Sequence, residues 1–256
     1  TTSFIPGTTP PPWGGSEQSW TRWLGEQDSN DPLVTIRRQF TLPKGKNGTP
    51  VSYLCGNSLG PIPTRAKDLV SECLDDWADL GVTGHFEGKA PWYPYHELIR
   101  EGLARRVGAK PSEVVAMNAL TVNLHLLLTS FFRPNPTRGR TRILTDGPLF
   151  VSDRYALQSH LRLHKLDPEN DLVVLEPGPT GCVEESRIED LLADEGDSFA
   201  LSLFSGVNWL TGQRLDLKRL AQAAHAAGSV VGCDLAHAVG NRPLQLHADS
   251  IDFAVW

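Results

Sequence analysis

The stretch VVGCDLAHAVGN, residues 230–241, places an acidic side chain at the end of an apolar run. Small and β-branched residues lead to Asp234, and His237 follows three residues later. Burying a carboxylate costs free energy unless a cation or several hydrogen-bond donors accompany it. The pattern therefore predicts that Asp234 either pairs with a cationic ligand or serves as a helix cap or a core-paired aspartate.

Three further segments carry residues suited to ligand binding. Residues 118–121, 146–153 and 205–209 each follow a short apolar run, as residues 234–237 do. If these runs are parallel strands, their carboxyl ends meet at one edge of a sheet, where ligands bind. A helix that begins at Leu120 and Thr121 would offer free N–H groups to a phosphate. An ordinary helix start is the alternative at that position.

A cofactor with a cationic ring and a phosphate would use both the Asp234 carboxylate and the helix start at Leu120 and Thr121. Pyridoxal phosphate requires an aspartate beside its pyridine nitrogen, a phosphate site, a ring-stacking residue and a lysine. Phe150 is the candidate for stacking. No dinucleotide, P-loop, serine-hydrolase or zinc-protease motif competes with this hypothesis. His160 and His164 lie one helical turn apart without an evident third ligand, so we expect a solvated helix face and predict no metal site.

The elements that position these residues follow from the apolar patterning. Strands are predicted at residues 113–118, 141–146, 171–177, 199–205, 229–235 and 251–256, with helices at 119–132, 151–164, 185–195 and 216–228. This alternation predicts an α/β fold with a mostly parallel sheet flanked by helices. We expect three regions: a flexible N-terminal arm (1–30), N-terminal helices and substrate-side loops (31–112), and a cofactor-binding large domain (113–256).

Composition limits the classes of partner. The 256 residues carry a net charge of −6 and show no basic stripe, so neither nucleic acid nor a membrane surface is an expected partner. The N-terminal residues lack the pattern of a signal peptide. Four widely spaced cysteines without a CxxC motif indicate reduced thiols in an intracellular protein, which we expect to be cytoplasmic; a secreted protein with free thiols is the alternative.

Six motifs in order along the chain carry a resemblance to a known family. They are YLCGNSLG (53–60), VTGHFEGKAPW (82–92), MNALTVNLHLLL (117–128), LFVSDRYALQS (149–159), LFSGVNWLTGQ (203–213) and CDLAHAVGN (233–241). From about residue 30 onward the chain resembles the kynureninases, which are pyridoxal-phosphate enzymes with the type I, aspartate-aminotransferase fold.

The resemblance implies a role for each matching position. Asp234 would pair with the pyridinium nitrogen and take part in catalysis. The other implied cofactor contacts are Leu120, Thr121, Phe150, Val151, Ser152, Asp153, Ser205 and His237. Ser58 and His85 would face the substrate, and a histidine at the latter position favours the 3-hydroxylated substrate. This sequence departs from the family pattern at two places. Val151 stands where the family usually has proline, and the family usually has more aromatic residues at positions 207–210.

The implied reaction is hydrolysis of L-kynurenine or 3-hydroxy-L-kynurenine to anthranilate or 3-hydroxyanthranilate and L-alanine. This reaction belongs to tryptophan catabolism and NAD biosynthesis. The resemblance also implies a homodimer, and a small C-terminal domain that is missing here.

One residue of the family pattern has no counterpart. The family places its Schiff-base lysine shortly after the strand that ends this chain at Trp256, and none of the seven lysines present is a credible substitute. We expect one half of an enzyme completed by a second polypeptide, a truncated form of an ordinary enzyme, or a non-catalytic module that binds cofactor or a partner. A second polypeptide that co-purifies with the chain would favour the first expectation.

Overall fold

The computed structural model describes residues 17–256, and residues 1–16 of the predicted arm lie outside the described residues. The described residues form two compact units, one of residues 17–56 and 60–79 and the other of residues 57–59 and 80–256. Helix α4 (Arg100–Val107) buries Ala104 and Val107 in the core of the second unit. The predicted domain boundary between residues 112 and 113 stays a prediction.

The first unit holds short elements with little buried surface. These are α1 (Glu17–Asn30), α2 (Val34–Arg37), the antiparallel pair β1 (Phe40–Thr41) and β2 (Ile62–Pro63), and α3 (Ala66–Leu80). Residues 17–30 were expected to belong to a flexible arm, but they form α1. Trp20, Trp23 and Leu24 recur there at the spacing of one helix face, a signal distinct from the Pro- and Gly-rich residues before it.

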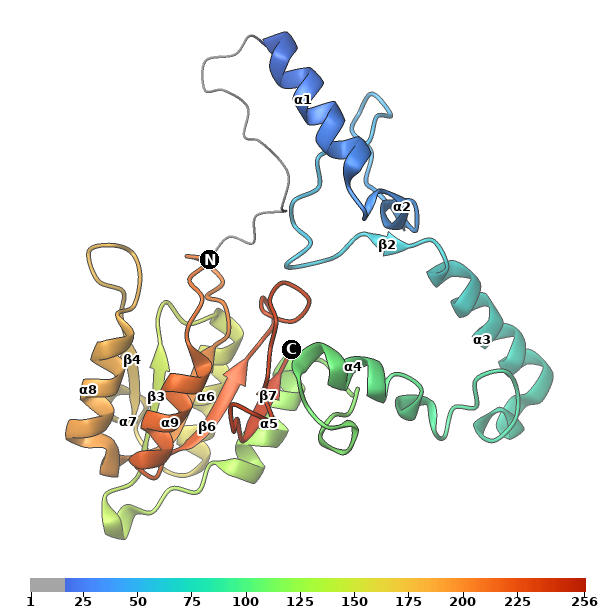
Figure 1. Ribbon diagram of the computed structural model, residues 1–256. Coiled ribbons are helices and arrows are strands. Elements are labelled where there is room, and N and C mark those ends of the chain that lie inside the picture. Colours follow the sequence, from blue (N-terminus) through green and yellow to red (C-terminus); the bar gives the residue numbers. More distant parts are fainter. Residues whose placement is uncertain (1–16) are drawn as a thin grey trace. The chain divides into compact units, whose positions relative to one another are not determined.

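A five-stranded parallel sheet forms the centre of the second unit (Figure 1). Its strands are β3 (Arg142–Asp146), β4 (Leu172–Leu175), β5 (Phe199–Ser205), β6 (Val230–Asp234) and β7 (Phe253–Val255), in the order β4-β3-β5-β6-β7. Every neighbouring pair is parallel. The predicted α/β class and the parallel sheet are confirmed.

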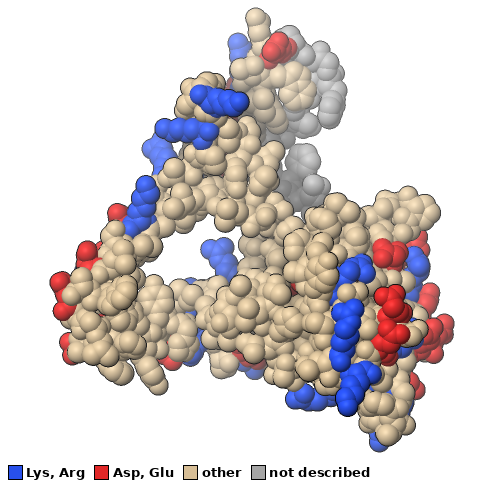
Figure 2. Space-filling model, turned by 180° about the vertical axis from the view of Figure 1, so that it is seen from behind, with Lys and Arg blue, Asp and Glu red and all other residues tan. Residues whose placement is uncertain are grey.

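Helices cover both faces of this sheet. They are α5 (Leu120–Phe131), α6 (Val151–Leu163), α7 (Pro168–Asp171), α8 (Glu185–Glu195) and α9 (Leu217–Ala226). Short 3-10 turns are η1 (Gly81–His85), η2 (Tyr95–Glu97), η3 (Pro111–Glu113), η4 (Pro136–Arg138) and η5 (Gly196–Ser198). On the outer surface acidic and basic side chains lie side by side (Figure 2), and Arg219 of α9 pairs with Glu189 of α8.

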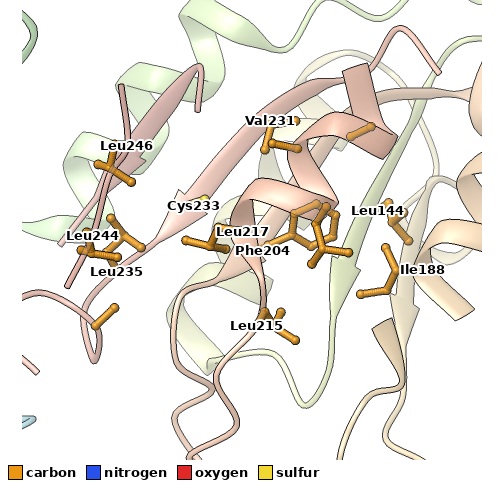
Figure 3. Packing of buried hydrophobic residues seen from close by; sticks show 14 of the residues in the cluster. Leu144, Ile188, Phe204, Leu215, Leu217, Val231, Cys233, Leu235, Leu244 and Leu246 are labelled. Carbon is orange, nitrogen blue, oxygen red and sulfur yellow. The ribbon is translucent and has the colours of Figure 1, made fainter. Parts of the chain in front are cut away.

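Two hydrophobic cores lie on opposite faces of the sheet. Successive residues of β3 alternate between them, because side chains of a strand point to opposite faces. Leu144 joins Ile188, Phe204 and Val231 in the core beneath α8 and α9 (Figure 3). Ile143 instead joins the core of α5 and α6, which also holds Leu124, Leu157 and Leu201. The sheet is thus buried on both faces, as its nearly continuous apolar strands require.

The strand predicted at residues 113–118 is wrong. Residues 111–113 form η3, and residues 114–118 form no strand, although Val114 has an extended backbone (φ −126°, ψ 136°). A strand needs a hydrogen-bonded neighbour, and no described residue pairs with this segment. Residues 114–118 line a cavity of about 930 Å³ together with β7.

His160 differs from the expectation of a solvated helix face, whereas His164 is exposed as expected. His160 is buried, and its ring lies 5.0 Å from that of His164 and 5.7 Å from that of Phe132. Burial and the neighbouring histidines lower the pKa of His160, so it is neutral at neutral pH. The pair belongs to the packing between α5 and α6. Among residues 17–256 no cluster of three potential metal-ligating side chains occurs.

Candidate cofactor site

A cavity of about 280 Å³ lies at the carboxyl ends of β3, β5 and β6. All four segments predicted to meet there contribute to its lining. Of the predicted cofactor contacts, those that line it are Leu120, Thr121, Phe150, Ser152, Asp153, Ser205, Asp234 and His237. Val151 does not; it begins α6 with a side chain that is 56% exposed.

The register of the sheet brings the polar strand ends together. Ser205 and Asp234 are directly paired as the last residues of β5 and β6, and Asp146 is the last residue of β3. The N–H of Gly206 donates to the Asp234 carbonyl at 2.8 Å, which continues the ladder by one residue. The parallel arrangement therefore places three polar side chains along one edge of the sheet.

A pair of carboxylates forms the acidic part of the cavity. Asp153, in the first turn of α6, is 1% exposed and hydrogen-bonds with Asp234. Burial, followed by the charge and the hydrogen bond of Asp234, raises the pKa of Asp153 to about 8. Asp153 is therefore mainly protonated at neutral pH. Asp234 accepts a hydrogen bond from the N–H of Ala236 at 2.8 Å, so the protonated Asp153 lies beside a carboxyl group that already has a backbone donor.

Asp146 is a second buried acid with a different surrounding. Its carboxylate accepts hydrogen bonds from the N–H of Ser205 at 2.8 Å and from the Ser205 hydroxyl. Asn208 Nδ2 lies 3.5 Å from the same carboxylate. Burial raises the pKa of Asp146, and the Ser205 donors oppose that rise. The sequence placed Asp146 at the edge of the sheet but gave no sign of its partner, because Ser205 belongs to another strand.

The opposite part of the cavity is a helix N-terminus. Asn118 turns the chain with a φ of +42°, and α5 follows Ala119, whose side chain provides no cap. The first N–H groups of an α-helix have no partner within the helix and favour anions. Ala119, Leu120 and Thr121 all line the cavity, so these donors and the Thr121 hydroxyl face a ligand bound there.

An aromatic wall connects the two parts. Phe150, which precedes α6, is 43% exposed, and Trp209 packs edge-on against it with ring centroids 5.5 Å apart at 83°. A cationic ring nitrogen fits the Asp153–Asp234 pair, a flat ring fits the face of Phe150, and a phosphate fits the start of α5. The donors, acceptors and apolar surface present thus fit pyridoxal phosphate.

Two predicted substrate residues stay apart from this cavity. Ser58 and His85 are both exposed, and neither is among the described residues that line it. His85 ends η1, where Nδ1 lies 3.1 Å from the Val82 carbonyl oxygen and the ring meets that of Trp92 at 5.2 Å. Their substrate roles stay predictions.

No lysine lines the cavity in the described part of the chain. All seven lysines have exposed side chains, and they stand at positions 44, 46, 67, 89, 110, 165 and 218. The cavity therefore offers non-covalent contacts to a cofactor but no amine for a Schiff base. Within residues 17–256 no helix has the length and apolarity needed to cross a membrane.

The fold and the site define an α/β protein of the type that binds pyridoxal phosphate. Residues 56–256 match the family model of class V aminotransferases, and the chain belongs to that family. Pyridoxal 5′-phosphate is the cofactor of these enzymes. The fold is also similar to that of the cysteine desulfurase CsdA of Escherichia coli, with a TM-score of 0.62 and 18% identity over 88% of this chain and 53% of that one.

Among curated proteins the chain is similar to kynureninases. It is 49% identical over 230 residues to the kynureninase of Xanthomonas oryzae pv. oryzae strain PXO99A, and equally to that of Xanthomonas campestris pv. campestris strain B100. Each alignment covers 90% of this chain and 54% of the relative. The chain thus spans about half the length of the curated relatives it matches.

Proposed function

We propose that the chain forms the cofactor-binding part of a kynureninase. The assembled enzyme would hydrolyse L-kynurenine or 3-hydroxy-L-kynurenine to anthranilate or 3-hydroxyanthranilate and L-alanine. The observation that carries the proposal is the Asp153–Asp234 pair at the edge of the sheet, in a chain 49% identical to kynureninases. A buried Asp153 beside the partly buried Asp234 gives an acidic site that is suited to a cationic partner.

In this proposal the chain's residues hold the cofactor by its three chemical parts. When bound, pyridoxal phosphate supplies an electron sink for bonds broken at the amino-acid substrate. Asp234 would hold the ring nitrogen in its protonated form, and the protonated Asp153 would donate a hydrogen bond to Asp234. Thr121 and the N-terminus of α5 would hold the phosphate, and Phe150 would cover one face of the ring.

The substrate side and the assembly belong to the same proposal. Ser58 and His85 would face the substrate in the assembled enzyme, with His85 favouring the 3-hydroxylated form. The Schiff-base lysine would come from residues beyond these 256, and the enzyme would act as a cytoplasmic homodimer in tryptophan catabolism and NAD biosynthesis. One other candidate is a module that binds the cofactor without turnover.

Binding of pyridoxamine 5′-phosphate tests the cofactor site directly, because this compound forms no bond to a lysine. Equilibrium dialysis with the 256-residue chain should detect binding, and Asp234→Asn should weaken it about tenfold or more, as loss of a charged hydrogen bond does. Asp190→Asn, on the exposed side of α8, is the matched control and should bind normally. Equal affinities for all three proteins would contradict the proposed role of Asp234.

A borohydride experiment separates the two candidate functions. The purified material is mixed with pyridoxal phosphate, reduced, and analysed by intact mass. A reduced cofactor adduct on a second polypeptide, with kynurenine hydrolysis, supports the enzyme. Binding of pyridoxamine phosphate without any adduct or hydrolysis supports the non-catalytic module.

A further inference from the structure

The loop that follows β5, residues 206–215, is organised by one side chain. Asn208 Oδ1 accepts hydrogen bonds from the N–H groups of Leu210 and Thr211 at 3.1 and 3.2 Å. The backbone N–H of Asn208 donates to the Gln213 carbonyl at 2.8 Å, and the N–H of Gly212 donates to the Asn208 carbonyl at 3.0 Å. Asn208 is buried, so these bonds give the loop a defined shape without regular secondary structure.

Both ends of the loop are fixed to the body of the second unit. Arg242 Nη1 donates to the carbonyls of Gly206 and Leu215, each at 3.0 Å. The amide of Gln213 accepts from the N–H of Val183 at 2.7 Å and donates to the Val183 carbonyl at 2.6 Å. The loop is thereby anchored to neighbouring segments on both sides.

Trp209 is the residue through which this loop reaches Phe150. Its Nε1 donates to the Pro148 carbonyl at 2.9 Å, and its ring packs edge-on against Phe150. Asn208 Nδ2 lies 3.4 Å from the carbonyls of both Gly147 and Pro148. Phe150 is 43% exposed and belongs to neither buried core, so the core does not fix its ring.

We propose that Trp209 is a positioning residue that holds Phe150 in the orientation needed to cover the cofactor ring. The inference rests on the proposed function, since Phe150 is assigned there as the ring-stacking residue. An edge-to-face aromatic contact that fixes this ring lowers the entropy lost when the cofactor binds. Trp209 also lines the cavity, and we assign its effect on the cofactor to Phe150 and to the 147–150 turn, where Trp209 donates a hydrogen bond to the Pro148 carbonyl.

The test combines binding with backbone hydrogen exchange. Trp209→Ala removes both the indole donor and the aromatic contact, Trp209→Phe removes only the donor, and Leu210→Ala is the control. Leu210 is 63% exposed and does not line the cavity. In Trp209→Ala we expect roughly two- to tenfold weaker binding of pyridoxamine 5′-phosphate and a weaker circular-dichroism signal from the bound ring. Trp209→Phe should lose less, and Leu210→Ala should match the wild type.

Hydrogen exchange of residues 149–151 tests the hold on Phe150 without any cofactor. Exchange should be faster in Trp209→Ala than in Leu210→Ala, while the strands exchange alike in both. Unchanged exchange overturns the inference, and faster exchange with unchanged cofactor affinity overturns its link to cofactor binding. If the wild type fails to bind pyridoxamine phosphate, the cofactor proposal fails, and the exchange rates still decide whether Trp209 fixes Phe150.

Discussion

Asp153 and Asp234 share a hydrogen bond at the edge of the sheet, one from the first turn of α6 and the other from the end of β6. The contact joins residues far apart in the sequence and, together with the burial of Asp153, raises the pKa of that carboxyl group. It thereby links the protonation of the site to the stability of the fold.

Asp153 should make the protein less stable as the pH rises. Its pKa is about 8 in the folded protein and 3.8 as an isolated side chain, so the folded state keeps a proton that the unfolded state releases. The free energy of unfolding therefore decreases as the pH rises from about 3.8 to about 8. The stabilisation that comes from the proton on Asp153 is lost once the pH exceeds the folded pKa. Asp153→Asn should flatten this dependence in urea unfolding measured across the range. An unchanged slope in Asp153→Asn, equal to that of the control Asp190→Asn, would disprove the shift.

The N-terminus of α5 should recognise phosphate. Pyridoxamine 5′-phosphate should bind roughly tenfold or more tightly than pyridoxamine, because the phosphate gains hydrogen bonds to N–H groups that have no helical partner. Thr121→Val should reduce that ratio. Thr129→Val, further along the same helix with an exposed side chain, should leave it unchanged. Equal affinity for the two ligands would place the phosphate elsewhere.

Removal of the Ser205 hydroxyl should destabilise the fold. Ser205→Ala leaves the buried carboxylate of Asp146 with one fewer donor, which costs about 1–3 kcal/mol. Chemical denaturation at neutral pH measures the loss. Ser186→Ala replaces an exposed serine on α8 and should change stability by less than about 0.5 kcal/mol. Similar values for both variants would mean that the hydroxyl contributes nothing to Asp146.

Two glycines offer a test of packing with opposite expected signs. A Cβ at Gly232 in β6 would lie 2.2 Å from the Phe253 ring of β7, so Gly232→Ala should cost about 1–3 kcal/mol. A Cβ at Gly102 in α4 would meet nothing within 4 Å, so Gly102→Ala should stabilise by up to about 1 kcal/mol. Thermal unfolding of the two variants gives the comparison. A neutral result at Gly232 would show that Phe253 moves easily.

Much of this architecture could be predicted because the strands are apolar on both faces. The apolar run that ends at Asp234 predicted a strand and placed Asp234 at the carboxyl edge of the sheet. The alternation of apolar strands and helices also predicted that a helix begins near Leu120. Residues 114–118 show an equally apolar run without forming a strand, since pairing depends on a neighbour that a single run does not reveal. The pKa of Asp153 and the bond from Trp209 to Pro148 depend on contacts between distant segments, which the spacing of residues does not encode.

The alternation of β3 between two cores has a consequence for how the site tolerates mutation. Ile143 and Leu144 pack on opposite faces, so a single-residue insertion or deletion within β3 would exchange their environments and turn Asp146 away from Ser205. Such a change would disable the cavity without replacing any residue that lines it. Over these strands natural variation should therefore consist of substitutions, with changes in length confined to the connections between strands.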